Sequence, residues 1–409
     1  MYRLCLILCC LVVASCQGAG GGLRAAIDQR IDSGEYLGAV ALVERHGRIV
    51  ELHAAGHRDL ARTAAMDVDA IFRIYSMTKT VATVGALVLA DRGVFGLDDP
   101  VARFLPEFAG LQVLAGGSAD APTLRAARRP LTIRHLLIHA AGFAVGGDDA
   151  PAAVELLRRA ALDDAADMAD YCRRLAAVPL ATDPGTRFNY DGVQFVVLGR
   201  LIEVAAGMPL DRFLQENVFA PLRMHDTGFA VPSAARGRIA EMTSTDVEGR
   251  LIASPEYAGR MPGELINRFP SAAGGLYSTA RDFHRFSRML LNGGSLDGAR
   301  ILERATVAEM MSNQLPRLDP PATEFRPGAG FGLGGEIVTD PARRGVAGSA
   351  GMYGWPGAAS TWYFIHPSQE LIAILLMQHL PQGLPRDPPK PGTAFYNQVY
   401  RSHARQRSP

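Results

Sequence analysis

The chain has 409 residues, of which 48% are hydrophobic and 20% are charged, and it is long enough for one large or two ordinary domains with a hydrophobic core. Its formal net charge is +1. No dense run of Lys and Arg with interleaved aromatic residues occurs, which argues against a nucleic acid as a partner.

The first residues are expected to lie outside the folded domain. Arg3 precedes an apolar run over residues 4–14, which is too short to cross a bilayer as a helix and is typical of a secretory signal peptide. Its end, Val-Ala-Ser-Cys, resembles a bacterial lipobox. This resemblance implies a signal peptide over residues 1–15, a lipid anchor on Cys16 at the periplasmic or extracellular side of a membrane, and a flexible tether over residues 16–22. A plain secretory signal with incidental cysteines is the alternative.

Cysteine usage gives no disulfide framework for the folded part. Four of the five cysteines lie in the N-terminal segment, which leaves Cys172 alone in the rest of the chain. Cys172 stands beside Tyr171 within a helical stretch and not at a helix start, so we expect it to pack in the core rather than to react.

Both ends of the folded part contain hairpin patterns. Residues 23–33 have helical periodicity, and residues 38–56 contain two β-rich runs around a His-Gly pair. Residues 360–378 contain a second pair of such runs around a Pro-Ser turn. We therefore predict one antiparallel sheet built from both ends of the chain.

The middle of the chain is predicted to be a mainly helical insertion. Linkers rich in Pro and Gly follow later in the chain, at residues 316–330 and 380–392. Predicted helices cover residues 130–143, 192–207, 209–222, 280–291 and 303–313. The expected organisation is a domain over residues 23–380, with its sheet part at about 23–90 and 255–380 and a helical insertion at about 91–254. A Pro-rich and basic tail follows at 381–409, and its last residues, 400–409, are expected to be frayed and solvated.

A serine and a lysine stand three residues apart at the start of an apolar helical stretch, IYSMTKTVATVGALVLADRG. On a helix, Ser76 and Lys79 would be neighbours. A serine hydroxyl needs an adjacent base to act as a nucleophile, and a helix N-terminus offers N–H groups to a developing oxyanion. A Ser helix cap followed by an exposed Lys fits the same tetrapeptide.

The segments around this pair resemble a known family. They resemble the serine β-lactamase and penicillin-recognising superfamily, and are most similar to class C β-lactamases and family VIII carboxylesterases. The resemblance runs from about residue 23 to residue 377 in the family's order, and it implies an α/β fold with an antiparallel sheet and a helical subdomain. It rests on IFRIYSMTKTVATVGALVLADRG, LDDPVARFLPEF, PLTIRHLLIHAAGF, PGTRFNYDGVQFVVLGRLIE, SAAGGLYSTARDFHRFSRMLLNGG, GFGLGGEIV and GMYGWPGAASTWYFIHPSQELIAILLMQ.

The resemblance implies a role for each matched residue. Ser76 matches the acylated nucleophile, and Lys79 matches the amine that hydrogen-bonds to it. Tyr190 matches the tyrosine that acts as general base and later as acid. The segment Trp-Pro-Gly-Ala takes the place of the family's Lys-Thr-Gly strand, so the backbone N–H groups of Ser76 and Ala358 would form the oxyanion hole.

Two departures from the family pattern bear on the substrate. Gly192 stands where an Asn amide is usual, and Trp355 replaces the Lys that holds a carboxylate. Both favour an uncharged ester over a β-lactam, and a Trp-x-Gly strand is what family VIII esterases have. Trp355 and Gly357 are predicted to contact substrate. Tyr75 and Tyr353 are further candidates, for which simple packing is the alternative.

Other catalytic classes have less support. The sequence contains no G-x-S-x-G motif, and its nearest approach, around Ser349, has Ala for the first Gly. Among ten histidines, His135 and His139 share a helical face but lack a third ligand, so we expect no metal and no cofactor. Arg343 and Arg344 could replace the missing strand cation, although a solvated pair is the simpler interpretation.

The sequence therefore predicts a serine hydrolase that cleaves a small-molecule ester or amide through an acyl-enzyme on Ser76. A β-lactamase or D-amino-acid-specific peptidase acting on cell-wall fragments is the alternative enzyme. A catalytically silent lipoprotein with the same fold is the alternative outside enzymes. No contact with a membrane is expected beyond the lipid anchor.

Overall fold

The computed structural model describes residues 21–144, 146, 149–255, 263–265 and 268–404. The predicted signal peptide, Cys16 and most of the predicted tether lie outside the described residues, as do residues 405–409.

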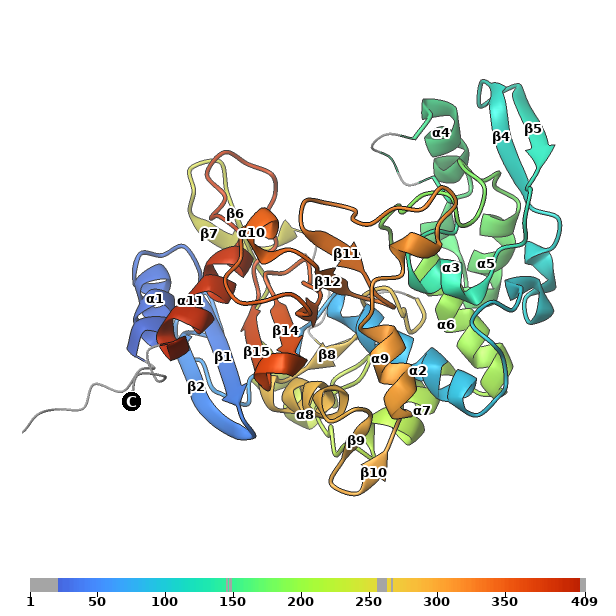
Figure 1. The fold of residues 1–409 in the computed structure, drawn as a ribbon. Helices are drawn as coiled ribbons and strands as arrows, with labels where there is room; N and C mark the ends of the chain where they lie inside the picture. The colour runs from blue at the N-terminus through green and yellow to red at the C-terminus, as the bar shows by residue number, and fades with distance from the viewer. Residues whose placement is uncertain (1–20, 145, 147–148, 256–262, 266–267, 405–409) are drawn as a thin grey trace, which may run out of the picture.

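A seven-stranded antiparallel sheet joins the two ends of the chain, as predicted (Figure 1). The N-terminal strand β1 pairs with β15 in a continuous register from Ala39 opposite Met377 to Arg45 opposite Leu371. In sheet order, the strands are β11 (Ala329–Phe331), β12 (Glu336–Val338), β13 (Tyr353–Gly354), β14 (Trp362–His366), β15 (Leu371–Met377), β1 (Gly38–Arg45) and β2 (Arg48–Gly56).

The first hairpin has the turn that its sequence predicts. His46 has a φ of 48° and Gly47 a φ of 77°. Two central residues with positive φ define a type I′ turn, whose twist matches that of paired strands. The His-Gly pair therefore fixes the register of β1 against β2.

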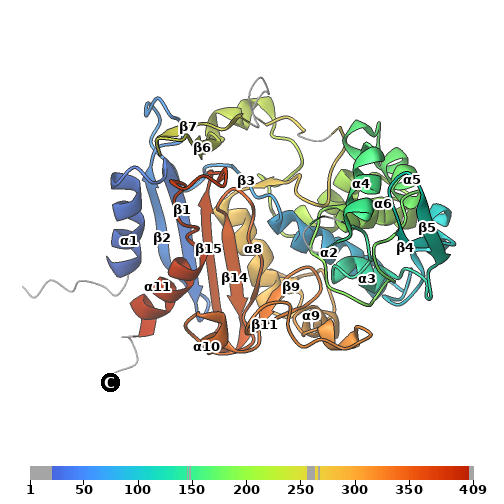
Figure 2. The ribbon, with the colours of Figure 1, turned by 90° about the horizontal axis from the view of Figure 1, so that it is seen from above.

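Helices cover both faces of the sheet, which explains why β1 is apolar at nearly every position (Figure 2). Ala39, Ala41 and Val43 face α1 (Gly21–Asp32) and α11 (Gly392–Ala404). Val40 and Leu42 belong to the larger core on the opposite face, where α8 (Ala280–Leu291) packs on β1 and β15.

Part of the predicted tail, residues 392–404, is helical, and the expectation of fraying is wrong for residues 400–404. The helical segment is α11, and its Phe395 and Val399 are buried against Leu23 and Ile27 of α1. One apolar residue per helical turn was the signal for this packing. The folded domain therefore extends at least to α11.

A helical part lies beside the sheet, and α2 (Met77–Asp91) lies between the two (Figure 2). Gly207, with a φ of 65°, ends α6 as predicted. The helix predicted at 209–222 instead comprises α7 and a π-helical segment at Gln215–Phe219. The other helices are α3 (Ile133–Leu137), α4 (Pro151–Arg159), α5 (Met168–Ala176), α6 (Val193–Ala206), α7 (Leu210–Leu214), α9 (Arg304–Met310) and α10 (Pro341–Arg344).

Four short two-stranded sheets lie outside the large sheet in the described residues, and none of them was predicted. They are β3 (Phe72–Arg73) with β8 (Tyr277–Ser278), β4 (Gln112–Gly117) with β5 (Pro122–Ala126), β6 (Thr243–Thr245) with β7 (Leu251–Ala253), and β9 (Ser295–Leu296) with β10 (Ala299–Arg300). The β3–β8 pair matters for the site, because β3 leads directly into the segment before Ser76.

No single helix in the described ranges has both the length and the hydropathy to cross a membrane. Only α6 taken together with Leu210–Phe219 meets these criteria, and the two are bent by 76°. Phe195, Leu201 and Phe213 of this pair are buried in the core, which accounts for its hydropathy.

Candidate active site

The predicted nucleophile and its amine partner meet at the start of α2. Every residue from Met77 to Leu89 is buried, so α2 is a core helix that holds its first turn rigidly. The Ser76 side chain makes no capping hydrogen bond, and Lys79 is only 3% exposed, so a Ser cap with an exposed Lys is ruled out. Lys79 Nζ instead donates to Ser76 Oγ at 3.2 Å and to the Ala273 carbonyl at 2.7 Å.

The chain enters this helix through a strained residue. Tyr75 has a φ of 43°, which is uncommon for a bulky side chain and occurs mainly at functional sites. Its ring lies 4.5 Å from the Arg73 guanidinium and packs on Met242, Ala359 and Leu380. Tyr75 is not among the residues that line the pocket described next, so its predicted contact with substrate is not supported by this geometry.

Ser76 opens into a pocket of about 190 Å³. The pocket is lined by Ser76, Tyr190, Trp355, Pro356, Gly357, Ala358, Ser360, Trp362 and Lys390. The Trp355 indole N–H donates to the Tyr190 hydroxyl oxygen at 2.9 Å, and Lys79 Nζ lies 5.1 Å from the centroid of the Tyr190 ring. A donor therefore contacts the phenol oxygen, and a cation lies near the ring.

Two residues that line this pocket were predicted to supply the backbone N–H groups of an oxyanion hole. Ser76 and Ala358 both line it, and neither N–H donates to an acceptor among the residues that the structure describes. Unpaired N–H groups beside a nucleophile are what a developing oxyanion requires.

The structure explains why residue 357 is a glycine, apart from any contact with substrate. Its N–H donates to the Thr361 carbonyl at 2.8 Å. A Cβ built on Gly357 would lie 2.2 Å from Thr361 Oγ1 and 2.4 Å from the Ile74 carbonyl oxygen. Glycine therefore lets this segment approach the backbone just before Ser76, which brings Ala358 to the nucleophile.

The prediction that Tyr353 contacts substrate is wrong. Tyr353 is fully buried, and its hydroxyl donates to the Leu333 carbonyl at 2.8 Å. Its ring would be 2.7 Å from a Cβ on Gly335, which shows close packing at that position. Tyr353 therefore packs in the hydrophobic core, which was the alternative to a contact with substrate.

Behind Tyr190 lies a buried polar layer. The Asp191 carboxylate accepts hydrogen bonds from the Gln194 backbone N–H at 2.9 Å and from its side-chain amide at 2.6 Å. Burial raises the pKa of Asp191 to about 6, although these hydrogen bonds and the charge of Lys79 oppose the rise. The His139 ring lies 4.6 Å from the Tyr190 ring, and burial lowers the pKa of His139 well below its usual value.

The two histidines considered for metal binding are used otherwise. His139 Nδ1 accepts from the Asp191 N–H at 3.4 Å, and His135 Nδ1 accepts from the Thr132 N–H at 3.2 Å. Within the described ranges, no group of three or more His, Cys, Asp or Glu side chains is arranged to hold a metal ion. Cys172 is buried in α5, and burial raises the pKa of its thiol.

Neither Arg343 nor Arg344 replaces the missing strand cation. Arg343 forms a two-pronged ion pair with Glu324 at 2.8 and 2.9 Å. Arg344 pairs with Glu336 at 2.6 Å and its side chain is only 15% exposed, so the interpretation as a solvated pair is wrong for this residue.

Four lining residues were not predicted from the sequence: Pro356, Ser360, Trp362 and Lys390. A compositional signal existed for two of them. The chain has just two tryptophans and two lysines, and one of each had already been assigned to the site. The remaining Trp362 and Lys390 line the same pocket.

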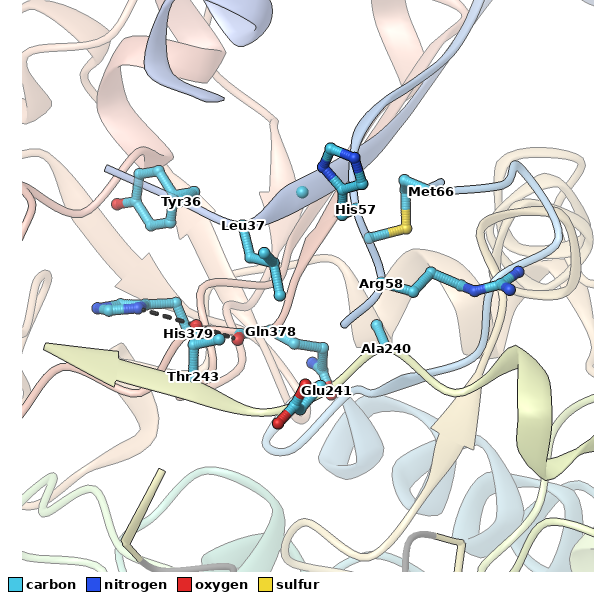
Figure 3. Close-up of a pocket in the computed structure, with 11 residues that line it drawn as sticks. Tyr36, Leu37, His57, Arg58, Met66, Ala240, Glu241, Thr243, Gln378 and His379 are labelled. Atoms are coloured by element: carbon cyan, nitrogen blue, oxygen red, sulfur yellow. Dashed lines mark hydrogen bonds between the residues drawn. The ribbon is translucent and has the colours of Figure 1, made fainter. Parts of the chain in front are cut away.

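A second, much smaller cavity lies near the start of β1. It has a volume of about 10 Å³, enough for one water molecule, and Tyr36, His57 and Glu241 are among the residues around it (Figure 3). It includes none of the residues predicted to act in catalysis.

The sheet, the helical part and the Ser-x-x-Lys pair on the helix between them define a serine hydrolase with the fold of penicillin-recognising enzymes. The family model described as Beta-lactamase matches residues 23–392, and the chain belongs to this β-lactamase family. It is an enzyme of the serine hydrolase type.

Relatives with assigned and unassigned functions cover nearly the whole chain. An uncharacterized protein of Mycobacterium tuberculosis is 35% identical over 88% of this chain and 90% of its own. Esterase EstB of Burkholderia gladioli is 30% identical over 88% of this chain and 91% of its own. The structure of simvastatin synthase (LovD) from Aspergillus terreus aligns with a TM-score of 0.78 at 25% identity, over 94% of this chain and 98% of that chain.

Proposed function

We propose that this protein is an esterase that hydrolyses small-molecule esters through an acyl-enzyme on Ser76. The observation that carries the proposal is the 3.2 Å contact of Lys79 Nζ with Ser76 Oγ at the wall of a pocket that also contains Tyr190. A neutral hydroxyl becomes an effective nucleophile only beside a group that takes its proton, and Lys79 and Tyr190 supply two such groups.

The reaction proceeds in two acyl-transfer steps. Ser76 Oγ attacks the ester carbonyl carbon while its proton passes to the Lys79–Tyr190 pair. The backbone N–H groups of Ser76 and Ala358 hold the oxyanion, and the alcohol leaves with the transferred proton. Water then attacks the acyl-enzyme with the same groups as base, which releases the acid and restores the Ser76 hydroxyl.

Three observations favour an ester over a β-lactam. Trp355 stands where the family's β-lactamases have a cation, and its N–H is already used by Tyr190. The relative from Burkholderia gladioli that covers nearly all of this chain is named an esterase. Gly192 supplies no amide at the position where a β-lactamase has one.

The test compares wild type with Ser76→Ala on 4-nitrophenyl acyl esters of increasing chain length and on a chromogenic cephalosporin. We expect ester turnover that falls about 10³-fold or more in Ser76→Ala, with little cephalosporin turnover in either protein. Ser349→Ala is the matched control, because Ser349 Oγ contacts His366 Nε2 at 3.0 Å and is the nearest approach to another hydrolase motif. Equal loss in both variants would refute a role specific to Ser76.

The same experiment separates the alternatives. Rapid cephalosporin turnover, or labelling of Ser76 by a fluorescent penicillin, would support a β-lactamase or D-amino-acid-specific peptidase instead. A folded protein whose Ser76 does not react with a fluorophosphonate probe would support a silent binding protein.

Export and anchoring are a separate proposal that rests on the sequence before residue 21. We expect Cys16 to carry a lipid, and metabolic labelling with a fatty acid tests it. A labelled protein that loses its label in Cys16→Ser would support the anchor, whereas an unlabelled, released protein would support the plain secretory signal.

A further inference from the structure

The pocket contains a cation that neither the catalytic scheme nor the family pattern uses. Lys390 is the charged residue among those that line the pocket, and no Asp or Glu of the described chain joins it there. Its ammonium makes no ion pair or hydrogen bond to another described residue. An unpaired cation at the edge of a pocket attracts an anionic group of a ligand that enters the pocket.

The backbone around Lys390 is held on both sides. Before it, the Pro389 carbonyl accepts a hydrogen bond from the Tyr36 hydroxyl at 3.0 Å. After it, the Pro391 carbonyl accepts the first hydrogen bond of α11, from the Phe395 N–H at 2.7 Å. Gly392 lies so close to the Trp362 ring that a Cβ there would approach it within 2.4 Å.

The acidic residue in the same linker does not neutralise Lys390. Asp387 accepts a hydrogen bond from the Leu384 N–H at 2.9 Å, which closes a turn within the linker. Arg386, the other cation of this linker, points elsewhere and donates to the Glu248 carbonyl at 2.8 Å. Lys390 is therefore the cation of this linker that lines the pocket.

Among the described residues, arginine and histidine side chains pair with carboxylates, and neither lysine does. Lys79 and Lys390 are the only lysines of the chain, although Lys and Arg together number 42. The lysine ammonium is a compact charge with three rotatable donors, whereas the planar arginine guanidinium binds a carboxylate through two parallel hydrogen bonds. Lysine therefore suits a ligand whose carboxylate can take more than one orientation. Both lysines of the chain contact or line the catalytic pocket.

We infer that Lys390 binds a carboxylate on the acyl part of the substrate, so that the preferred esters are those of short dicarboxylic acids. This inference rests on the proposed function and narrows its substrate class. The acyl group stays on Ser76 during both steps, in the pocket that Lys390 also lines. A pocket of about 190 Å³ is smaller than the roughly 300–1,000 Å³ of typical ligand pockets, which favours a short chain.

The test uses two esters of equal acyl chain length, 4-nitrophenyl hydrogen adipate and 4-nitrophenyl hexanoate. The readout is the ratio of kcat/KM for the adipate to that for the hexanoate. We expect Lys390→Gln to lower this ratio about tenfold, Lys390→Glu to lower it further, and Lys390→Arg to keep it within about twofold. High salt should lower the ratio in wild type and leave it unchanged in Lys390→Gln.

Arg386→Gln is the matched control, since it removes the same charge from the same linker outside the pocket. A ratio that is the same in wild type and Lys390→Gln would overturn the inference. So would an equal fall in Arg386→Gln, because it would indicate only the net charge of the protein.

A second readout does not depend on turnover. Both tryptophans of the chain line the pocket, so intrinsic fluorescence reports its occupancy directly. In Ser76→Ala, monomethyl adipate should bind more tightly than methyl hexanoate, and adding Lys390→Gln should abolish the difference. If wild type hydrolyses neither ester, the proposed function fails, while this titration still supports the role of Lys390 or, if the difference persists, refutes it.

Discussion

The two walls of the pocket come from different parts of the molecule and differ in how they are held. The nucleophile wall consists of Ser76 and Tyr190. Lys79 contacts Ser76 from behind this wall and is 3% exposed at the start of a core helix. The recognition wall consists of residues 355–358, Trp362 and Lys390, and it is assembled from the connection between β13 and β14 and from the linker before α11. Lys390 is exposed.

The residues that carry out the reaction are therefore held differently from the residues that recognise the substrate. A reacting pair must stay within hydrogen-bonding distance, and a fully packed helix provides that constancy. A linker on the surface can change its residues at little cost to the core, so substrate preference can change while the reaction is kept. Predictions that target the joint between the walls, the layer behind them or a single bond across them test this division.

The joint between the walls is Gly357, and its substitution should have the largest effect. In Gly357→Ala the new Cβ would meet Thr361 Oγ1 and the Ile74 carbonyl, so the Ala358 N–H must move away from Ser76. Loss of one oxyanion donor lowers kcat by about 10²–10³-fold. We expect a fall of this size in ester turnover, measured beside the thermal unfolding of the variant.

Gly237→Ala is the matched control, because a Cβ at Gly237 has no atom within 4 Å. It should leave both turnover and unfolding close to wild type. If Gly357→Ala kept its kcat, Ala358 would not be an oxyanion donor, and the close approach of the two walls would be structural alone.

The sheet was predictable because its signals are local. The His-Gly turn, the alternating or continuous apolar runs and the Pro-Ser turn are each contained within a few residues, and each hairpin buries what its pattern indicates. The helix α11 was missed because its apolar face is narrow and follows a Pro-rich linker, so its neighbours Leu23 and Ile27 could not be inferred from local sequence. The β4–β5 hairpin was missed because nearly all of its residues are at least partly exposed.

The same contrast applies to the site. Ser76 and Lys79 are three residues apart, so a helix alone brings them together. Tyr190 and Trp355 were placed by resemblance to a family, and their hydrogen bond could not be inferred from spacing. Lys390 lies in the linker before α11, and α11 packs on the sheet. The place of Lys390 in the pocket therefore depends on contacts between residues far apart in the sequence.

The layer behind the nucleophile wall should show itself in pH dependence. The pKa of Asp191 is raised to about 6, above the value of about 3.9 in an unfolded chain. The folded protein therefore holds an extra proton between these values, and its stability falls as pH rises through this window. Relative to Asp191→Asn, wild type should lose up to about 3 kcal/mol of unfolding free energy between pH 4 and pH 7.

Asp183 provides a control, because its pKa is shifted in the opposite direction to that of Asp191. Its two-pronged hydrogen bonds from Arg125 lower the pKa of Asp183 to about 2. Its stabilisation is present above pH 4 and is lost as pH falls toward 2, so Asp183→Asn should differ from wild type by a constant amount between pH 5 and pH 7. Urea unfolding across this range measures both variants, and parallel curves for both would refute the raised pKa of Asp191.

The single bond across the pocket, from the Trp355 N–H to the Tyr190 oxygen, should have the smallest of these effects. Trp355→Phe keeps an aromatic ring and removes only the donor, so we expect kcat/KM for a neutral ester to fall about tenfold, as for one hydrogen bond to a group that gains charge. Trp362→Phe is the control, because the buried Trp362 N–H has no hydrogen-bond partner among the described residues. A larger fall in Trp362→Phe than in Trp355→Phe would mean that both indoles act by filling space. The recognition wall would then contribute only its shape to catalysis.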